Sequence, residues 1–301
     1  MSSGGGAGSS GLDRQVLHVF HRETCGSRWN NRRGWAENAA DLRDWFGVQC
    51  SLPQSTERNG RVVVLTMTVD ELTGNGLVGT IPAELGRLES LMKLDLRVNN
   101  LSGRIPPELG QLVALETLGL ARNELDGSIP PEFGQLRALK ELYLSFNQLS
   151  GRIPSELGRL GAMVQLNISE NKLSGSIPPE LGCLDALTQL SISGNKLSGS
   201  IPPELGQLSA LEGLSLVHNR LSGSIPSGLG QLRALKGLHL SFNQLIGSIP
   251  PELGQLSALE TLWLAGNQLS GEKYGRSWLA ATAMWWRAYR YFLSVGRPRV
   301  P

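Results

Sequence analysis

Cysteine is scarce in this chain, which has three cysteines among 301 residues. An odd and small number of cysteines does not describe the disulfide framework that holds small secreted domains together. Charge of one sign is lacking as well, because 28 basic and 26 acidic residues leave a formal net charge of +2. A balanced chain lacks the strongly basic surface that nucleic-acid-binding proteins present. The composition therefore argues against a disulfide scaffold and against nucleic acid as the partner.

Long apolar runs are also lacking. No stretch of 18 consecutive apolar residues occurs, and no apolar segment of a secretory signal follows the start. The first residues read "MSSGGGAGSSG", a low-complexity stretch that we expect to be a flexible tail. These observations predict a cytoplasmic protein without a transmembrane segment. A protein at the cell surface, with its export signal lost or unconventional, is the alternative.

Signatures of catalysis and metal binding are missing too. The sequence contains no phosphate-binding loop, no paired catalytic carboxylates and no nucleophile elbow. His18, His21 and Cys25 share one face of a predicted helix, but a zinc site needs a fourth ligand. His239 would lie beside Ser215 on the next strand, without a carboxylate to orient the imidazole. We therefore predict no enzymatic activity, no metal site and no cofactor.

What the sequence has is a repeat. The fragment "GSIPPELGQLSALE" occurs at Gly199–Glu212 and again at Gly247–Glu260, and a degenerate copy, "GSIPSGLGQLRALK", begins between them at Gly223. Further copies before these set the period at 24 residues, and a period between 20 and 50 residues indicates a solenoid, a propeller or an array. One asparagine marks the same phase in every copy: Asn75, Asn99, Asn123, Asn147, Asn171, Asn195, Asn219, Asn243 and Asn267.

One unit reads "LMKLDLRVNNLSGRIPPELGQLVA", beginning at Leu91. Leu91, Leu94 and Leu96 alternate like a strand with one buried face, and "SG" supplies a turn. The segment "PPELGQL" is typical of a short helical turn, with prolines at its start, a glutamate near the positive end of the dipole, and Gly110 near its end. A single coil buries too little apolar surface to fold alone, so the coils must stack. We expect the asparagines, whose amides both donate and accept, to form a hydrogen-bonding ladder.

The pattern LxxLxLxxNxLSGxIPxxLGxL resembles the plant-type leucine-rich repeat from Leu91 to Ser270, as found in free-standing repeat proteins of algae and oomycetes and in receptor-kinase ectodomains. The resemblance implies an α/β solenoid, a right-handed superhelix of nine 24-residue coils with a parallel sheet on its concave side. In the first, irregular coil Asn75 lies eight residues beyond Met67 instead of three, which indicates a five-residue insertion.

The repeats divide the chain into a tail at 1–11, an N-terminal cap at 12–60, the repeat array at 61–271 and a basic, aromatic C-terminal segment at 272–301. Within the cap, "DWFGVQC" resembles the "CxWxGVxC" of plant-type caps, but Arg43 stands at its first cysteine position, and pairing of Cys25 with Cys50 stays open. The C-terminal segment is interpreted as a capping helix that covers the last coil. A contact with a membrane surface or a partner through Trp278–Phe292 is the alternative.

The strand positions that point away from the core vary most between the repeats, so we expect a partner to bind there. Nine strands at about 4.8 Å spacing make a face about 38 Å long, which suits a protein or a peptide better than an enclosed small molecule. We expect Phe146 and Phe242 to pack at the turn before the asparagine. The predicted function is a protein-interaction scaffold, with a cell-surface recognition or receptor-type protein as the alternative. The candidate partner-binding residues are Tyr143, Asn167, His239, Trp263, Glu141, Lys93 and Asp95, with Tyr143, His239 and Trp263 as anchors.

Overall fold

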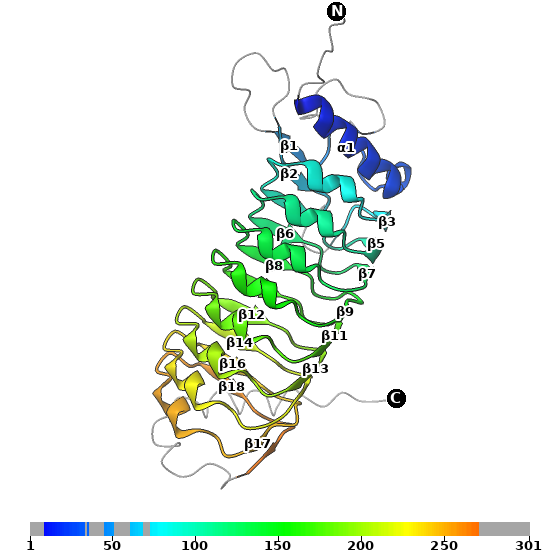
Figure 1. Cartoon of the computed structure of the whole chain (residues 1–301). Helices are drawn as coiled ribbons and strands as arrows, with labels where there is room; N and C mark the ends of the chain where they lie inside the picture. Colours follow the sequence, from blue (N-terminus) through cyan, green and yellow to red (C-terminus); the bar gives the residue numbers. More distant parts are fainter. Residues whose placement is uncertain (1–8, 34, 36–44, 51–60, 69–72, 271–301) are drawn as a thin grey trace, which may run out of the picture.

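The computed structural model describes residues 9–33, 35, 45–50, 61–68 and 73–270, so the segment 272–301 with its Trp278–Phe292 stretch lies outside the described residues. Stacked coils form an elongated body with helix α1 (Ser9–Glu23) at one end (Figure 1). The helix begins at Ser9, inside the stretch that we assigned to the tail. This arrangement is the solenoid that the 24-residue period predicts.

A ten-stranded sheet forms the concave face. Nine of its strands are parallel and come from successive repeats, with equivalent residues paired, so that Leu142 lies beside Leu166 and Leu166 beside Leu190. The tenth, β1, comes from the cap and pairs antiparallel with β2, which the sequence did not indicate. In spatial order the strands are β1 (Val48–Cys50), β2 (Val62–Thr66), β4 (Lys93–Asp95), β6 (Thr117–Gly119), β8 (Glu141–Tyr143), β10 (Gln165–Asn167), β12 (Gln189–Ser191), β14 (Gly213–Ser215), β16 (Gly237–His239) and β18 (Thr261–Trp263).

The "PPELGQ" segments form short 3-10 helices. Their prolines set the backbone at the start, and the leucine of each segment is buried. Gly110 has another role than ending the helix, because a Cβ there would lie 2.7 Å from the Glu132 backbone oxygen of the next coil. The glycine therefore permits close stacking of the coils. The segments are η3 (Ala83–Arg87), η4 (Pro107–Gln111), η5 (Pro131–Gln135), η6 (Ser155–Arg159), η7 (Pro179–Cys183), η8 (Pro203–Gln207), η9 (Ser227–Gln231) and η10 (Pro251–Gln255).

A second set of parallel strands runs along the side of the solenoid, where the sequence indicated only a turn. The glycine of each "SG" takes a positive φ, +74° at Gly103, which bends the chain within or at the end of these strands. The strands form three small sheets: β3 (Val78–Thr80), β5 (Asn100–Arg104) and β7 (Glu124–Asp126); β9 (Ser150–Gly151), β11 (Lys172–Gly175), β13 (Lys196–Gly199) and β15 (Arg220–Leu221); and β17 (Ile246–Gly247) with β19 (Gln268–Leu269).

The asparagine ladder is confirmed. Asn123 Oδ1 accepts the backbone N–H of Leu101 at 3.0 Å, and its Nδ2 donates to the backbone oxygens of Leu96 and Leu120, each at 3.0 Å. Each such side chain satisfies backbone groups of its own coil and of the preceding one. The first rung, Asn75, instead accepts from the backbone of Asn31 at 2.6 Å, and so joins the array to the cap.

The cap closes the hydrophobic core with aromatic side chains. Phe20, Trp29, Trp35 and Trp45 are buried and pack against one another, with ring centroids 4.7–6.1 Å apart. Thr68 and Gly74, at the two ends of the predicted insertion, form an antiparallel bridge. In the described part of the cap, no disulfide joins Cys25 to Cys50.

Candidate functional site

All seven candidate residues lie on the concave sheet, but they form two groups. Lys93 and Asp95 on β4 and Glu141 and Tyr143 on β8 belong to its N-terminal half, with Asn167 next to them on β10. His239 and Trp263 lie side by side on β16 and β18, since these strands pair in register. The two groups are separated by β12 and β14, whose outward side chains are small or neutral.

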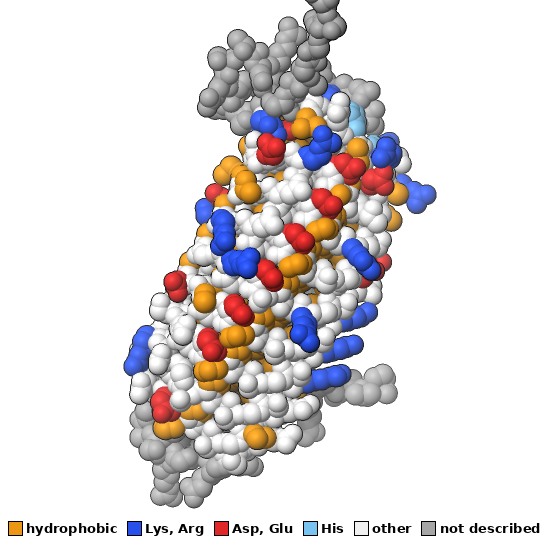
Figure 2. Space-filling view, viewed as in Figure 1, with side chains coloured by type: hydrophobic (Ala, Val, Ile, Leu, Met, Phe, Trp, Pro, Cys, Tyr) orange, Lys and Arg blue, Asp and Glu red, His pale blue; other side chains and the backbone are white. Residues whose placement is uncertain are grey.

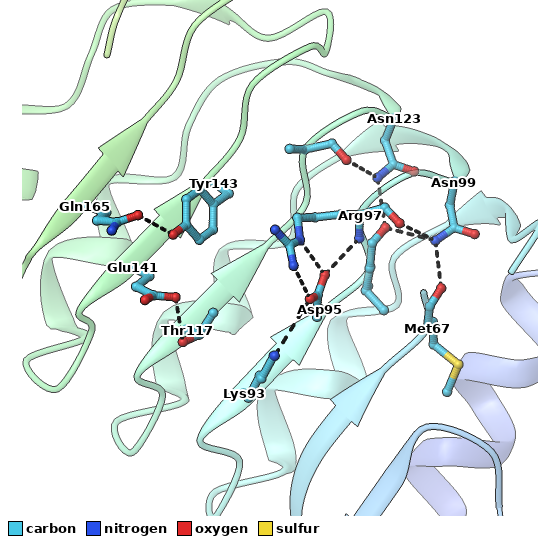
Figure 3. A network of polar contacts seen from close by, with 12 residues as sticks. Met67, Lys93, Asp95, Arg97, Asn99, Thr117, Asn123, Glu141, Tyr143 and Gln165 are labelled. Atoms are coloured by element: carbon cyan, nitrogen blue, oxygen red, sulfur yellow. Dashed lines mark hydrogen bonds and ion pairs between the residues drawn. The ribbon is translucent and has the colours of Figure 1, made fainter. Parts of the chain in front are cut away.

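The charged group in the N-terminal half is largely satisfied within the protein (Figure 3). Arg97 donates to both carboxylate oxygens of Asp95, at 2.8 and 2.7 Å, and Lys93 Nζ lies 3.9 Å away. Asp95 is 1 % exposed, which differs from the expectation of an accessible binding residue. The hydrogen bonds that Arg97 donates to Asp95 raise the pKa of Arg97, so this guanidinium is a permanent cation. Its fork is the geometry in which arginine binds carboxylates most strongly.

Tyr143 stands between this charged group and the centre of the sheet. Its hydroxyl donates to Gln165 Oε1, and the Arg97 guanidinium lies 5.4 Å from the ring centroid. Burial, followed by the nearby Glu141 carboxylate, raises the pKa of Tyr143, so the phenol keeps its proton at neutral pH. The ring therefore offers an apolar face held in place by a hydrogen bond and a cation–π contact.

A hollow of about 220 Å³ lies between Tyr143 and His239. The hollow exists because the residues of its floor are small: Gly213 and Gly237 carry no side chain, and serines occupy the neighbouring strand positions. A Cβ at Gly213 would lie 2.1 Å from Gln189 Oε1, so the glycine gives that amide its space. In the sequence, the two glycines at outward strand positions indicate where the hollow lies. The lining comprises Tyr143, Gln165, Leu166, Asn167, Gln189, Leu190, Ser191, Gly213, Leu214, Ser215, Gly237 and His239.

The C-terminal wall of the hollow is aromatic. The rings of His239 and Trp263 stack with centroids 4.0 Å apart and an interplanar angle of 17°. His239 Nε2 is 2.8 Å from Thr261 Oγ1, and burial lowers the pKa of this histidine. The neutral imidazole is thus the favoured form at neutral pH. Trp263 is 44 % exposed and presents a large apolar face to solvent.

Phe146 and Phe242, which directly precede asparagines of the ladder, do not pack into the turn as expected. Both side chains are exposed. The Arg122 guanidinium lies 4.7 Å from the Phe146 ring centroid, and His218 stacks on Phe242 at 4.4 Å. All four take positive φ values, between 53° and 57°, a conformation uncommon for residues with side chains. The coil geometry therefore holds a second pair of aromatics beside the concave sheet.

This arrangement presents groups that are suited to binding. Among the described residues, no three histidine, cysteine or acidic side chains gather to hold a metal ion. No helix in the same part of the chain is long and apolar enough to span a membrane. The groups that the sheet does present are an ion-paired carboxylate, a hollow lined by amides and hydroxyls, and exposed aromatic rings.

Comparison with family models agrees with the geometry. A model described as leucine rich repeat matches residues 89–149, and a second of the same description matches 163–184, 186–208, 210–232 and 234–256. No curated protein sequence matches the chain.

Solved structures with the same architecture include two plant receptor ectodomains. The leucine-rich-repeat ectodomain of the membrane receptor kinase GASSHO1/SCHENGEN3 from Arabidopsis thaliana, in complex with Casparian strip integrity factor 2, is 37 % identical over 85 % of this chain and 30 % of that one, with a TM-score of 0.78. The Arabidopsis receptor kinase HAESA, in complex with the peptide hormone IDA and the co-receptor SERK1, is 33 % identical over 87 % of this chain and 42 % of that one, with a TM-score of 0.74.

A third similar structure is a plant ice-binding protein, 28 % identical over 86 % of this chain and 87 % of that one, with a TM-score of 0.66. This chain spans less than half the length of the two receptor structures. Because GASSHO1/SCHENGEN3 was solved as an ectodomain, the expectation of a cytoplasmic protein finds no support in these similarities.

Proposed function

The chain belongs to the leucine-rich-repeat family, and from that premise we propose that it binds a peptide or a peptide-like segment of a protein across its concave face. The observation that carries the proposal is the hollow between Tyr143 and His239, with its small-residue floor. Four strand intervals of about 4.8 Å separate β8 from β16, a distance of about 19 Å. About six residues of extended chain span that distance.

The chemistry of the hollow favours a ligand with an uncharged middle. Gln165, Gln189 and Asn167 offer amides that both donate and accept, which matches the backbone N–H and C=O groups of an extended peptide. Trp263 and His239 offer stacking surfaces for one apolar side chain at the C-terminal wall. The peptide hormone bound by HAESA supports a ligand of this class. We assign the protein no catalytic role.

The test is selection from a random peptide library displayed on phage, with the full chain immobilised. We expect enriched peptides, and we expect Ser191→Phe, which fills the floor of the hollow, to lower their affinity at least tenfold. Ser191 faces the hollow and is half-buried, so the fold tolerates the larger ring. The matched control is Ser248→Phe at an exposed position on the side of the solenoid. Equal binding by the two variants contradicts the proposed site.

We infer that the protein acts outside the cell or at its surface, and the supporting observation is the similarity to a receptor ectodomain. Asn167, Ile168 and Ser169 form the glycosylation sequon Asn-x-Ser. Expression in a secreting eukaryotic host, with mass spectrometry before and after removal of N-glycans, tests whether Asn167 carries a glycan. The redox state of Cys25 and Cys50 in the native protein provides an independent test. Reduced thiols and retention inside the native cell contradict the inferred location and leave the binding site untouched.

A glycan at Asn167 would occupy the hollow, because this side chain belongs to its lining. Peptide binding and glycosylation of Asn167 are therefore mutually exclusive in the proposed mode. We expect Asn167→Gln protein from the same secreting host to bind selected peptides at least tenfold more tightly than the glycosylated chain.

A further inference from the structure

A column of basic side chains runs along the side of the solenoid. Lys172, Lys196 and Arg220 occupy the first position of β11, β13 and β15, three neighbouring strands of one small sheet. Arg152 follows directly after β9, the remaining strand of that sheet. All four side chains are exposed, and none of the strands of this sheet contains an acidic residue. Figure 2 shows basic side chains projecting one below another at the edge where Figure 1 labels β9, β11 and β13.

These cations have no acidic partner within the described chain. Lys172 Nζ donates to Gln148 Oε1 at 3.1 Å, and no hydrogen bond or ion pair from another described residue engages the side chains of Arg152, Lys196 and Arg220. By contrast, Lys140 and Lys236 on the concave side pair with Glu116 and Glu212, each at 2.8 Å. The column is therefore a concentrated positive charge that the fold leaves uncompensated.

The fold does not need cations at this position. Other coils carry glutamine at the same phase, at Gln148, Gln244 and Gln268, and form the same lateral strands or connections. Like charges on adjacent strands repel one another and lower stability slightly. The three consecutive cations thus slightly lower the stability of the free protein, and an anionic partner would offset this repulsion.

We propose that the basic column, Lys172, Lys196 and Arg220 with Arg152 at its end, binds an acidic polysaccharide that carries one carboxylate or sulfate group per sugar. Strand spacing and the two-residue offset in the pairing of these strands put the Cα atoms of neighbouring cations about 8 Å apart. A linear chain with regularly repeated negative charges can meet such a row with one charge per coil.

A polysaccharide fits this surface better than a membrane or an acidic peptide does. The side chains between the cations are serines, Ser174 and Ser198, whose hydroxyls complement the hydroxyls of sugars. A planar anionic membrane would also meet Glu124 and Asp126, which are exposed on β7 of the adjacent coil. A peptide gains affinity from pockets for its side chains. These strands offer no such pockets, because the residue after each cation, Leu173, Leu197 or Leu221, points into the core and is buried.

The test measures binding of the full chain to immobilised polygalacturonate at low ionic strength without calcium. We expect the unmodified protein to be retained and to elute as salt rises, because exposed charges are screened. The triple variant Lys172→Gln, Lys196→Gln and Arg220→Gln should lose at least tenfold in affinity. Glutamine is the residue that other coils use here, so folding should be preserved.

The matched control removes three exposed basic residues elsewhere, Arg28→Gln, Arg87→Gln and Arg159→Gln, and changes the net charge equally. We expect its affinity to stay within about twofold of the parent. The assignment is overturned if the parent does not bind, if both triple variants lose affinity equally, or if the methyl-esterified, neutral polymer binds as well. Tighter binding to polyglutamate than to polygalacturonate would replace the polysaccharide by an acidic protein partner. The Ser191→Phe variant should bind polygalacturonate normally, which separates this surface from the concave site.

Discussion

The two halves of the concave sheet are built from the same repeat and use their outward positions differently. In the N-terminal half, Asp95 is buried beneath Arg97, and Tyr143 is held by Gln165. In the C-terminal half, glycines and serines leave space, and Trp263 remains 44 % exposed next to His239. A charged residue on the concave sheet can therefore serve the fold instead of a partner, as Asp95 does. We expect the N-terminal half to contribute stability and the C-terminal half to contribute affinity.

Among the surface substitutions, Arg97→Ala in the N-terminal half should have the largest effect on stability. This change leaves the Asp95 carboxylate, whose side chain is 2 % exposed, with Lys93 at 3.9 Å as its one cation and with the backbone N–H of residue 97 at 3.3 Å. Removing one partner of a buried pair strands the other charge, and we expect a loss of about 3 kcal/mol in the free energy of unfolding. Urea unfolding followed by circular dichroism measures it. Arg104→Ala, an exposed arginine of the same coil, should cost less than about 0.5 kcal/mol. Equal midpoints for the two variants would show that Asp95 finds other partners.

Trp263→Ala should affect binding most in the C-terminal half. Buried interface aromatics commonly contribute 2 kcal/mol or more, which corresponds to about a thirtyfold loss of affinity for a library-selected peptide. Lys93→Ala should change that affinity less than about twofold. Leu238→Ala, a core change beneath His239, should lower stability by about 2–5 kcal/mol and serves as the folding control. Isothermal titration with all three variants decides between the halves. A larger loss for Lys93→Ala than for Trp263→Ala reverses our assignment.

The sequence predicts those features of the site that the 24-residue period determines, and it does not predict the others. The 24-residue register places equivalent residues on adjacent strands, so the neighbourhood of His239 and Trp263 followed directly from counting. The burial of Asp95 did not follow, because it depends on the direction that the Arg97 side chain takes across the strand. Strand β1 and the lateral sheets were missed as well. The cap is not periodic, and "LSG" segments carry too few alternating apolar residues to indicate strands.

A glycine of the "ELG" segment tests whether the C-terminal end of the array is stacked as tightly as its interior. A Cβ at Gly182 would lie 2.4 Å from the Glu204 backbone oxygen of the next coil, whereas a Cβ at Gly254 meets nothing within 4 Å in the described part of the chain. Overpacking of this kind costs about 1–3 kcal/mol, so Gly182→Ala should lower the melting temperature. Gly254→Ala should leave it unchanged or raise it slightly, since alanine restricts the unfolded chain. A similar fall in both variants indicates close packing beyond residue 270.

The smallest effect concerns pH and belongs to the C-terminal half. Burial lowers the pKa of His239 below its usual value of about 6.5. In the window between the lowered pKa and about 6.5, the unfolded chain therefore binds more protons than the folded one. Stability should thus be complete above pH 6.5 and should decrease as pH falls through that window. His18 and His21 of the cap, whose pKa values burial also lowers, act in the same direction.

The pH dependence of peptide affinity distinguishes the protonation of His239 from that of the two cap histidines. A ligand that covers the hollow buries His239 further and favours its neutral form even more, so binding should weaken below the pKa of the free protein, by up to about tenfold per pH unit. Titrations between pH 7.5 and pH 5.0 measure this slope. His239→Gln, which keeps a polar group near Thr261 Oγ1, should abolish the slope, whereas His21→Gln in the cap should leave it intact. If the slope persists in His239→Gln, the titrating group lies in the ligand or elsewhere on the concave sheet, and the aromatic wall is not the pH-sensitive part of the site.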